Sequence, residues 1–181
     1  MWKIFNKFAI PLLRSSFIVI TKTLNAMTEK TLTTTIQVLD YSDLTAAESE
    51  LANRAKEATG GSYAPYSHFH VGAAIKLENG VIIKGANQEN AAFSGICGER
   101  SAFYNAGANY PGVDVTVVAI AARDDKGFVD EPCSPCGLCR QAMLEFEKNS
   151  KHPITVLLVG EKCIYRLPSV ASLLPLCFTE F

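Results

Sequence analysis

Three cysteines and one glutamate stand at spacings that can build a zinc site with a carboxylate beside it. Cys136 and Cys139 are three residues apart, which places both sulfurs on one face of a helix's first turn, and thiolate is a ligand that suits zinc. Cys97 is the natural third ligand, because Glu99 follows it by two residues and can meet a metal-bound water without itself ligating. Three protein ligands leave a fourth position to water, which is the pattern of a catalytic zinc site.

A fourth cysteine leaves the choice of ligands open on spacing alone. Cys133 and Cys136 also form a Cys-x-x-Cys pair, so Cys133/Cys136, Cys136/Cys139 and a four-thiolate site are all permitted. The same pattern also serves thioredoxin-like redox chemistry. Cys163 and Cys177 are interpreted as small apolar residues.

The segments around these residues resemble the homotetrameric zinc-dependent cytidine deaminases, within the cytidine and deoxycytidylate deaminase superfamily. The metal-site motifs are Cys97-Gly98-Glu99-Arg100 and Ser134-Pro135-Cys136-Gly137-Leu138-Cys139-Arg140-Gln141. Further similar segments are the family's first-strand, ribose-binding and C-terminal segments, at residues 63–74, 85–91 and 173–178. The resemblance covers roughly residues 42–178. Its second motif assigns the ligands to Cys136 and Cys139 and leaves Cys133 as a spare thiol.

The resemblance implies hydrolytic deamination of cytidine and 2'-deoxycytidine to uridine and 2'-deoxyuridine, a reaction of pyrimidine salvage, with one Zn²⁺ per subunit. In that mechanism zinc activates water, Glu99 takes its proton, the hydroxide attacks C4 of the pyrimidine, and Glu99 protonates N3 and then the leaving amine. Three thiolates leave a net charge near −1 on the site, and Arg100 and two helix N-termini are expected to offset it. Arg140 is a further candidate for the same role.

The substrate contacts come mainly from the same resemblance. Asn87 and Glu89 match the ribose-binding pair, and two residues that are two apart on an extended segment point the same way. Phe69 matches the aromatic residue that stacks on the base, and the backbone amide of Gly98, where alanine is usual, can hydrogen-bond the base. Phe178 matches the aromatic residue that enters a neighbouring subunit's site, which implies a homotetramer with shared active sites.

The segment between the ribose-binding pair and the first metal ligand departs from the family. Residues 90–96 make this link one residue shorter than the family pattern. We therefore expect a changed pocket wall and unchanged chemistry.

Periodicity and turn signals predict the elements that position these residues. Thr45 and Glu48 form a capping box that begins a first helix, and Asn79-Gly80 predicts a hairpin turn in which both residues have positive φ. The expected helices span residues 45–59, 97–105, 135–148 and 169–174. The expected strands span residues 69–77, 81–86, 113–122, 154–160 and 163–167, the last at an edge of the sheet. This order predicts an α/β fold, a three-layer α/β/α sandwich with a mixed five-stranded sheet.

Composition sets broader limits. The 181 residues, 48% of them hydrophobic, suffice for one domain with a sizeable core. A net charge of −1 argues against a nucleic-acid partner, and the six cysteines are typical of a reduced, cytoplasmic metal protein rather than of a disulfide framework. Residues 1–26 are basic, with apolar runs too short to span a membrane, and are interpreted as a leader or disordered extension before a deaminase domain at residues 27–181.

Three other functions compete with nucleoside deamination. A polynucleotide-editing deaminase is disfavoured, because such relatives usually have histidine as the first ligand and a basic surface. A deaminase of a cytosine-containing antibiotic is disfavoured by Asn87 and Glu89. A structural zinc or redox module predicts that Glu99→Gln leaves every function intact.

Overall fold

The computed structural model describes residues 28–179 of the chain. The chain divides into two units, one ending at Thr31 and the other running from Leu32 to Phe181. Of the first unit, residues 28–31 are described, and they are exposed and without regular secondary structure. The predicted leader lies outside the described residues.

The helices and strands that the structure describes all belong to the second unit. Its α-helices are α1 (Ala46–Ala58), α2 (Gly98–Asn109) and α3 (Gly137–Asn149). Its strands are β1 (Gln37–Leu39), β2 (His70–Leu77), β3 (Ile82–Ala86), β4 (Val115–Asp124), β5 (Gly127–Phe128), β6 (Thr155–Val159) and β7 (Ile164–Leu167). Short 3₁₀ helices are η1 (Tyr41–Asp43), η2 (Thr59–Gly61) and η3 (Val170–Leu173).

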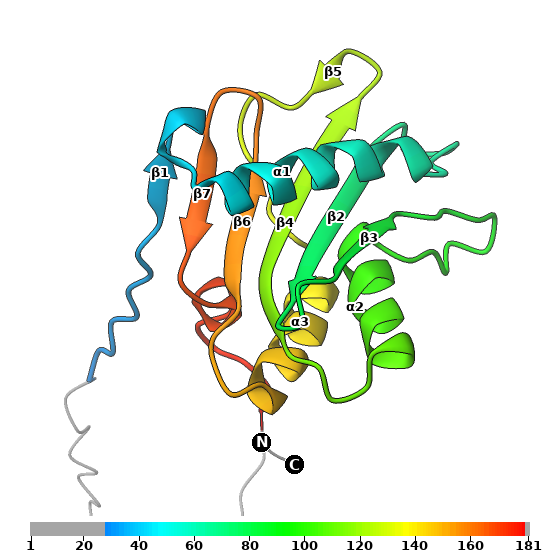
Figure 1. Ribbon diagram of the computed structural model, residues 1–181. Helices are drawn as coiled ribbons and strands as arrows, with labels where there is room; N and C mark the ends of the chain where they lie inside the picture. Colours follow the sequence, from blue (N-terminus) through cyan, green and yellow to red (C-terminus); the bar gives the residue numbers. More distant parts are fainter. Residues whose placement is uncertain (1–27, 180–181) are drawn as a thin grey trace, which may run out of the picture. The chain divides into compact units, whose positions relative to one another are not determined.

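The strands form one mixed sheet in the order β1-β7-β6-β4-β2-β3, with β5 paired only to β4 (Figure 1). Strands β4 and β6 run parallel, and every other pair is antiparallel. The predicted α/β fold with a mixed sheet is therefore confirmed. The described part of the chain contributes seven strands to it, so the predicted number of five was wrong.

The two additional strands are short. Strand β1 has three residues and β5 has two, too few for an alternating pattern to be recognised in the sequence. Strand β1 pairs with β7, so β7 is an inner strand, and the prediction that it lies at the edge was also wrong.

The hairpin between β2 and β3 is present, but its turn differs from the prediction. Gly80 has a φ of 86°, whereas Asn79 is not among the described residues with positive φ. The Gly80 amide donates to the Leu77 carbonyl, and the Leu77 amide donates to the Val81 carbonyl, both at 2.9 Å. These bonds define a three-residue loop that closes on a glycine, rather than a two-residue turn.

Helix α1 covers one face of the sheet (Figure 1). Thr45 caps it as predicted, because its hydroxyl accepts from the Glu48 amide and the Glu48 carboxylate accepts from the Thr45 amide. The buried side chains of the helix are Leu51, Ala52, Ala55 and Ala58.

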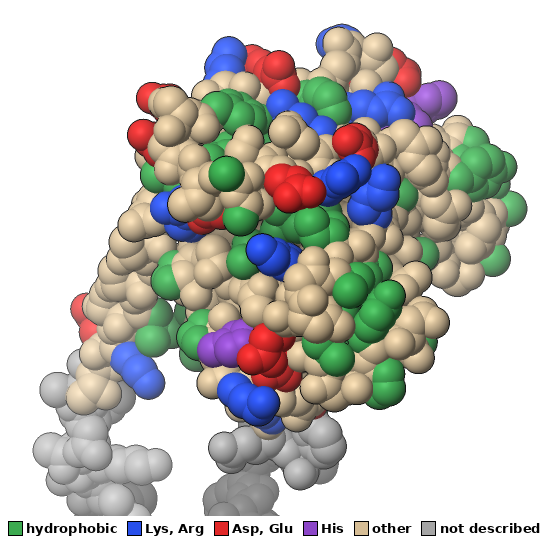
Figure 2. All heavy atoms as spheres, viewed as in Figure 1, with side chains coloured by type: hydrophobic (Ala, Val, Ile, Leu, Met, Phe, Trp, Pro, Cys, Tyr) green, Lys and Arg blue, Asp and Glu red, His purple; other side chains and the backbone are tan. Residues whose placement is uncertain are grey.

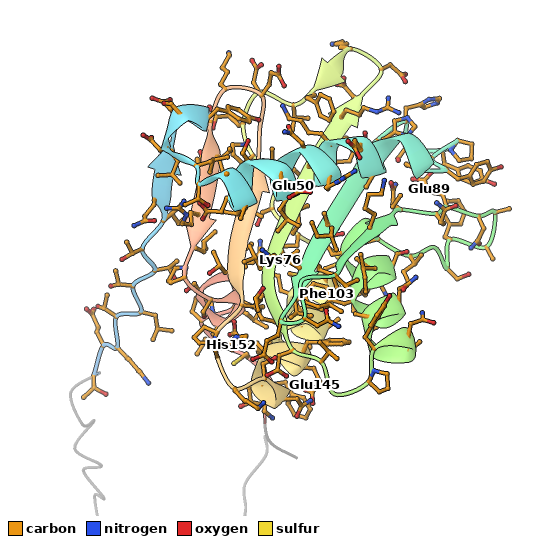
Figure 3. All side chains as sticks on the ribbon, viewed as in Figure 1. Glu50, Lys76, Glu89, Phe103, Glu145 and His152 are labelled. Carbon is orange, nitrogen blue, oxygen red and sulfur yellow. The ribbon has the colours of Figure 1, made fainter. Side chains whose placement is uncertain are left out.

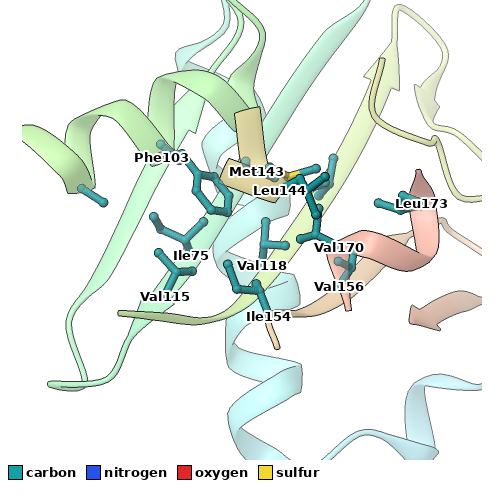
Figure 4. Close-up of a cluster of buried hydrophobic side chains, with 14 of the residues drawn as sticks. Ile75, Phe103, Val115, Val118, Met143, Leu144, Ile154, Val156, Val170 and Leu173 are labelled. Atoms are coloured by element: carbon teal, nitrogen blue, oxygen red, sulfur yellow. The ribbon is translucent and has the colours of Figure 1, made fainter. Parts of the chain in front are cut away.

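Helices α2 and α3 and the short η3 cover the other face. The side chains of β2 alternate, so that Ala74 packs with α1 whereas Ile75 belongs to the larger core on the opposite side. Phe103 of α2 is the largest fully buried side chain among the described residues (Figure 3). Met143 of α3 and Val170 of η3 belong to the same core (Figure 4). This packing fixes how α2 and α3 lie on the sheet.

The surface carries charges of both signs. Lysine and arginine side chains are interspersed with aspartate and glutamate on the face that Figure 2 shows. None of the helices described between residues 28 and 179 is long and apolar enough to span a membrane.

Candidate active site

The three predicted ligand cysteines lie together where two helices begin. Cys97 is the N-cap of α2 and Cys136 is the N-cap of α3, while Cys139 lies in the first turn of α3 and is fully buried. The Cys97 and Cys136 sulfurs are 3.8 Å apart, and the Cys136 and Cys139 sulfurs are 3.5 Å apart. All three sulfurs lie within 4.8 Å of one another.

This arrangement fits a tetrahedral zinc ion. A zinc–sulfur bond of about 2.3 Å places two sulfurs of a tetrahedral site about 3.8 Å apart, close to the observed separations. The positive ends of α2 and α3 both face the cluster, because Cys97 and Cys136 cap those helices. The residues present therefore suit a metal that prefers thiolates.

Cys133 does not belong to this cluster. It is half-buried, and its thiol lies 3.8 Å from the backbone oxygen of the next residue, Ser134. Burial raises the pKa of the Cys133 thiol, and the nearby Glu99 carboxylate raises it further. The structure therefore groups the same three cysteines that the family resemblance selects.

The neighbours of Cys97 favour its thiolate. The nearby Cys139 side chain, together with Arg100, lowers the pKa of Cys97 to about 5. Cys97 and burial in turn raise the pKa of Cys139. Burial alone would lower the pKa of Arg100, but the nearby Cys97 and Cys139 raise it instead. Arg100 is thus a cation beside these two sulfurs, and its buried Nε atom has no hydrogen-bond partner among the described residues.

Glu99 is buried beside the cluster. Only 3% of its surface is exposed, and burial, helped by the charge on Cys97, raises its pKa to about 7. Its Oε2 atom is buried and has no hydrogen-bond partner among the described residues. A buried carboxylate oxygen without a partner is costly, and such groups concentrate at functional sites.

A cavity of about 420 Å³ adjoins the cluster at Cys97. Two predicted substrate contacts, Asn87 and Glu89, line it. Segment 90–96, which the sequence predicts to form part of the pocket wall, contributes Asn90, Phe93, Gly95 and Ile96 to the lining. The lining residues that sequence reasoning does not name as contacts are Tyr66, Ser67 and Gln88, although all three lie in segments that support the family resemblance.

Asn87 is held by the protein around it. Its side-chain oxygen accepts from the Ser62 hydroxyl at 2.6 Å and from the Val71 amide at 2.8 Å. Its amide nitrogen donates to the Phe69 carbonyl at 2.9 Å, which leaves one N–H of this group for another acceptor. Asn87 therefore both positions the start of β2 and offers a donor at the cavity.

Glu89 has a different environment. Its Oε2 atom accepts from the amides of Tyr66 and Ser67 at 2.9 and 3.2 Å, and bonds from Ser67 and Tyr66 hold its pKa below the usual range. Glu89 lies at the loops after β3, far from Glu145 near the other end of the domain (Figure 3). It thus brings a carboxylate to the cavity wall.

The two predicted aromatic contacts are not among the residues that line this cavity. Phe69 is half-buried just before β2, and its carbonyl accepts the Asn87 bond. Phe178 is 64% exposed, and its backbone oxygen accepts from the Gln141 side chain at 2.7 Å. Their roles toward a substrate stay predictions.

The shortened segment 90–96 folds back on the extended segment before it. The amides of Gln88 and Ile96 each donate to the other's carbonyl, at 2.9 and 3.0 Å. Gly95 permits this approach, because a Cβ atom there would lie 2.4 Å from the Gln88 carbonyl oxygen. Phe93 lies in the segment with 86% of its surface exposed, and its ring centroid is 5.9 Å from that of Tyr66. Segment 90–96 thus forms a short closed loop in the pocket wall, and its difference from the family's wall stays a prediction.

Gly98 is packed against the sheet at the start of α2. A Cβ atom at this position would lie 2.8 Å from the Val71 carbonyl oxygen and 3.4 Å from the Ala86 Cα atom. Alanine, which the family resemblance leads one to expect here, would not fit without a shift of α2. Glycine therefore allows the helix that carries Glu99 to approach β2 and β3 closely.

Comparison with known proteins agrees with this geometry. The model of the cytidine and deoxycytidylate deaminase zinc-binding region matches residues 45–154. The chain belongs to the cytidine and deoxycytidylate deaminase family. The prediction that it is an enzyme of this family is thereby confirmed.

Individual relatives cover most of the folded unit. A cytidine deaminase of Sporosarcina psychrophila is 39% identical over 132 residues, which are 72% of this chain and 90% of that protein. One of Halalkalibacterium halodurans is 44% identical over 96 residues, 52% of this chain and 68% of that protein. The crystal structure of cytidine deaminase from Burkholderia pseudomallei matches with a TM-score of 0.62 and 36% identity, covering 75% of this chain and all of that one.

We expect Gly98→Ala to destabilise the protein by about 1–3 kcal/mol, the usual cost of an added methyl group in a tightly packed place. The clash with the Val71 carbonyl should outweigh the higher helix propensity of alanine. Denaturant unfolding of the zinc-loaded protein measures the difference. Gly137→Ala is the matched control, because Gly137 is the first residue of α3 and a Cβ there would meet nothing within 4 Å. Equal stabilities of the two variants would contradict this account of Gly98.

Proposed function

We propose that this chain catalyses the hydrolytic deamination of cytidine and 2'-deoxycytidine, giving uridine or 2'-deoxyuridine and ammonia, as a step of pyrimidine salvage. One observation carries the proposal. The buried carboxylate of Glu99, whose Oε2 atom has no hydrogen-bond partner among the described residues, lies beside a three-thiol cluster, and Cys97 of that cluster opens onto a cavity lined by Asn87 and Glu89.

Cys97, Cys136 and Cys139 are the residues that would hold one zinc ion per subunit. Zinc bound in such a site supplies a hydrolytic nucleophile by lowering the pKa of water. Arg100 offsets the excess negative charge of three thiolates, because it lies beside both Cys97 and Cys139. The N-termini of α2 and α3 act in the same direction.

Glu99 moves the protons of the reaction. Its carboxylate takes a proton from the attacking water and delivers it to N3 of the pyrimidine ring. It then takes the remaining proton from the hydroxyl group now on C4 and passes it to the amine, so that ammonia leaves as the C4 carbonyl forms. The sum is one water consumed and one ammonia released, with the carboxylate regenerated. Burial suits this task, because no side chain or backbone group between residues 28 and 179 bonds to the Oε2 atom of Glu99.

Asn87 and Glu89 bind the sugar, and the base lies toward Glu99. Both side chains line the cavity that reaches Cys97, and an amide donor with a carboxylate acceptor matches sugar hydroxyl groups, which both donate and accept. The Gly98 amide hydrogen-bonds the base, and Phe69 stacks on it. Phe178 completes the site of a neighbouring subunit in a homotetramer. The exposed ring of Phe178 near the C-terminus supports this last assignment.

The mechanism predicts different losses in two variants. Glu99→Gln should retain zinc and lose at least about 10²-fold in turnover, the lower range for removing a general acid/base. Cys97→Ala should lose zinc as well, because one of three ligands is removed. Ultraviolet assay of cytidine and deoxycytidine loss, paired with zinc content per chain, measures both. Full activity of Glu99→Gln would contradict the mechanism, and a zinc-loaded parent without turnover would point to another amine substrate or a structural site.

The role of Glu89 can be separated from a general effect on the fold. Glu89→Gln should raise KM for cytidine about ten-fold, since a bond to a charged acceptor is worth somewhat more than 1 kcal/mol. The glutamine keeps an oxygen for the Tyr66 and Ser67 amides. With 2',3'-dideoxycytidine, which lacks the 2'- and 3'-hydroxyl groups, the same variant should change KM less than two-fold. An equal change with both nucleosides would exclude hydroxyl recognition by Glu89.

Shared active sites predict complementation between two defective chains. Phe178→Ala should raise KM while retaining zinc, and sedimentation should show the mass of four chains. Mixed tetramers of Phe178→Ala with Glu99→Gln contain sites that combine an intact Glu99 with an intact Phe178 from the other chain. We therefore expect a kinetic phase with the parental KM in the mixture. Its absence in verified mixed tetramers would show that Phe178 does not act across subunits.

A further inference from the structure

Arg140 joins two parts of the protein that meet at the start of α3. The residue follows Cys139 and is half-buried. Its guanidinium donates from Nε to the Pro135 carbonyl at 2.8 Å and from one terminal nitrogen to the Ser134 hydroxyl at 2.8 Å. The other terminal nitrogen donates to the Leu173 carbonyl at 2.9 Å. All three acceptors are neutral.

These contacts distinguish Arg140 from Arg100. Arg100 lies near Cys97 and Cys139, which raise its pKa, whereas Arg140 donates hydrogen bonds to carbonyl and hydroxyl oxygens. The sequence-based expectation that Arg140 balances the charge of the thiolates is therefore replaced by another role. The planar guanidinium suits it, because lysine cannot present the same fixed set of donors.

The acceptors of Arg140 lie at functionally different places. Ser134 and Pro135 are the two residues before Cys136, so a bond to the Pro135 carbonyl holds the peptide group that leads into that cysteine. Leu173 is the last residue of η3, from which the chain continues to Phe178. One side chain thus holds both the loop before a ligand and the beginning of the C-terminal segment, residues 174–179.

Glu147 provides a comparison on the same helix. It lies seven residues after Arg140, two turns along the same side of α3. Its carboxylate accepts from the amides of Val170 and Ala171 at 2.7 and 3.0 Å, and from Ile154 at 2.8 Å. Glu147 therefore holds the first residues of η3 and Arg140 holds the last, but only Arg140 also holds the loop before Cys136.

We infer that Arg140 is a positioning residue that sets the Cys136 ligand through the Pro135 carbonyl and couples this ligand loop to the C-terminal segment. The inference rests on the proposed zinc site. It assigns Arg140 no contact with the substrate. Because coupling is reciprocal, zinc should order the C-terminal segment as much as that segment, through Arg140, stabilises bound zinc.

The test uses the full-length, zinc-loaded chain and Arg140→Lys, which keeps the charge and loses the fork of donors. Zinc release from Arg140→Lys to an excess of a chromogenic chelator should be about ten-fold faster than from the parent. This is the low end of the effect of losing a supporting contact around a metal ligand. Hydrogen exchange of residues 174–179 should also be faster. Removing zinc should speed this exchange in the parent and change it little in Arg140→Lys.

Glu147→Gln is the matched control. It should speed exchange around η3 and leave zinc release within two-fold of the parent, because it does not touch the loop before Cys136. Unchanged zinc release in a folded Arg140→Lys, or equal acceleration in both variants, would overturn the inference. Cytidine assays of the same samples keep the two proposals apart. A parent that holds zinc without deaminating cytidine refutes the proposed substrate alone, whereas normal turnover with unchanged zinc release refutes the role of Arg140 alone.

Discussion

The close approach of the Cys97 and Cys136 sulfurs, 3.8 Å apart, requires two helices to begin at the same point in the fold. The cysteines are 39 residues apart, so strands must bring them together. Strands β4 and β6 run parallel, and α3 forms the crossover between them, so α3 begins near the carboxyl end of β4. The start of α2 reaches the same place from β3. The sheet thus decides where the cluster forms.

Packing of α2 against the sheet then determines where Glu99 lies. Gly98 lets the first turn of the helix approach the Val71 carbonyl, and Phe103 anchors the next turns in the core. A carboxylate carried on such a helix has little freedom to reach water, which explains both its burial and its raised pKa. Because helix α2 is a rigid element, it holds the buried Glu99 carboxylate in a defined position, and the proposed proton transfers require such a position.

The surroundings of the cluster consist of loops, and polar bonds hold these loops in place. Asn87 ties Ser62 and Phe69 to β2, Glu89 ties the turn at Tyr66, and Arg140 ties the loop before Cys136 to η3. Each of these three side chains makes hydrogen bonds that backbone groups alone could not make. The cavity and the ligand loop therefore depend on a few polar residues, whereas the cluster itself depends on the hydrophobic core.

The sequence by itself determined the α/β class and the main helices and strands, because these depend on local periodicity. Spacing alone left the choice among Cys133, Cys136 and Cys139 open, and the family resemblance selected the two cysteines that the structure groups with Cys97. The Cys-x-x-Cys spacing places two sulfurs on one helical turn wherever that helix lies. Strands β1 and β5 were not predicted because they are too short to show an alternating pattern, and the inner position of β7 depends on pairing with β1, which lies far from it in the sequence. The turn at Gly80 was predicted with the wrong length, because Asn-Gly is compatible with a three-residue loop as well as with a two-residue turn. Only the tertiary structure decided that Tyr66 and Phe93 line the cavity, that Gly98 has no room for a methyl group, and that Arg140 contacts carbonyls rather than sulfurs. These facts depend on distances between segments far apart in the chain, and no local pattern of residues encodes such distances.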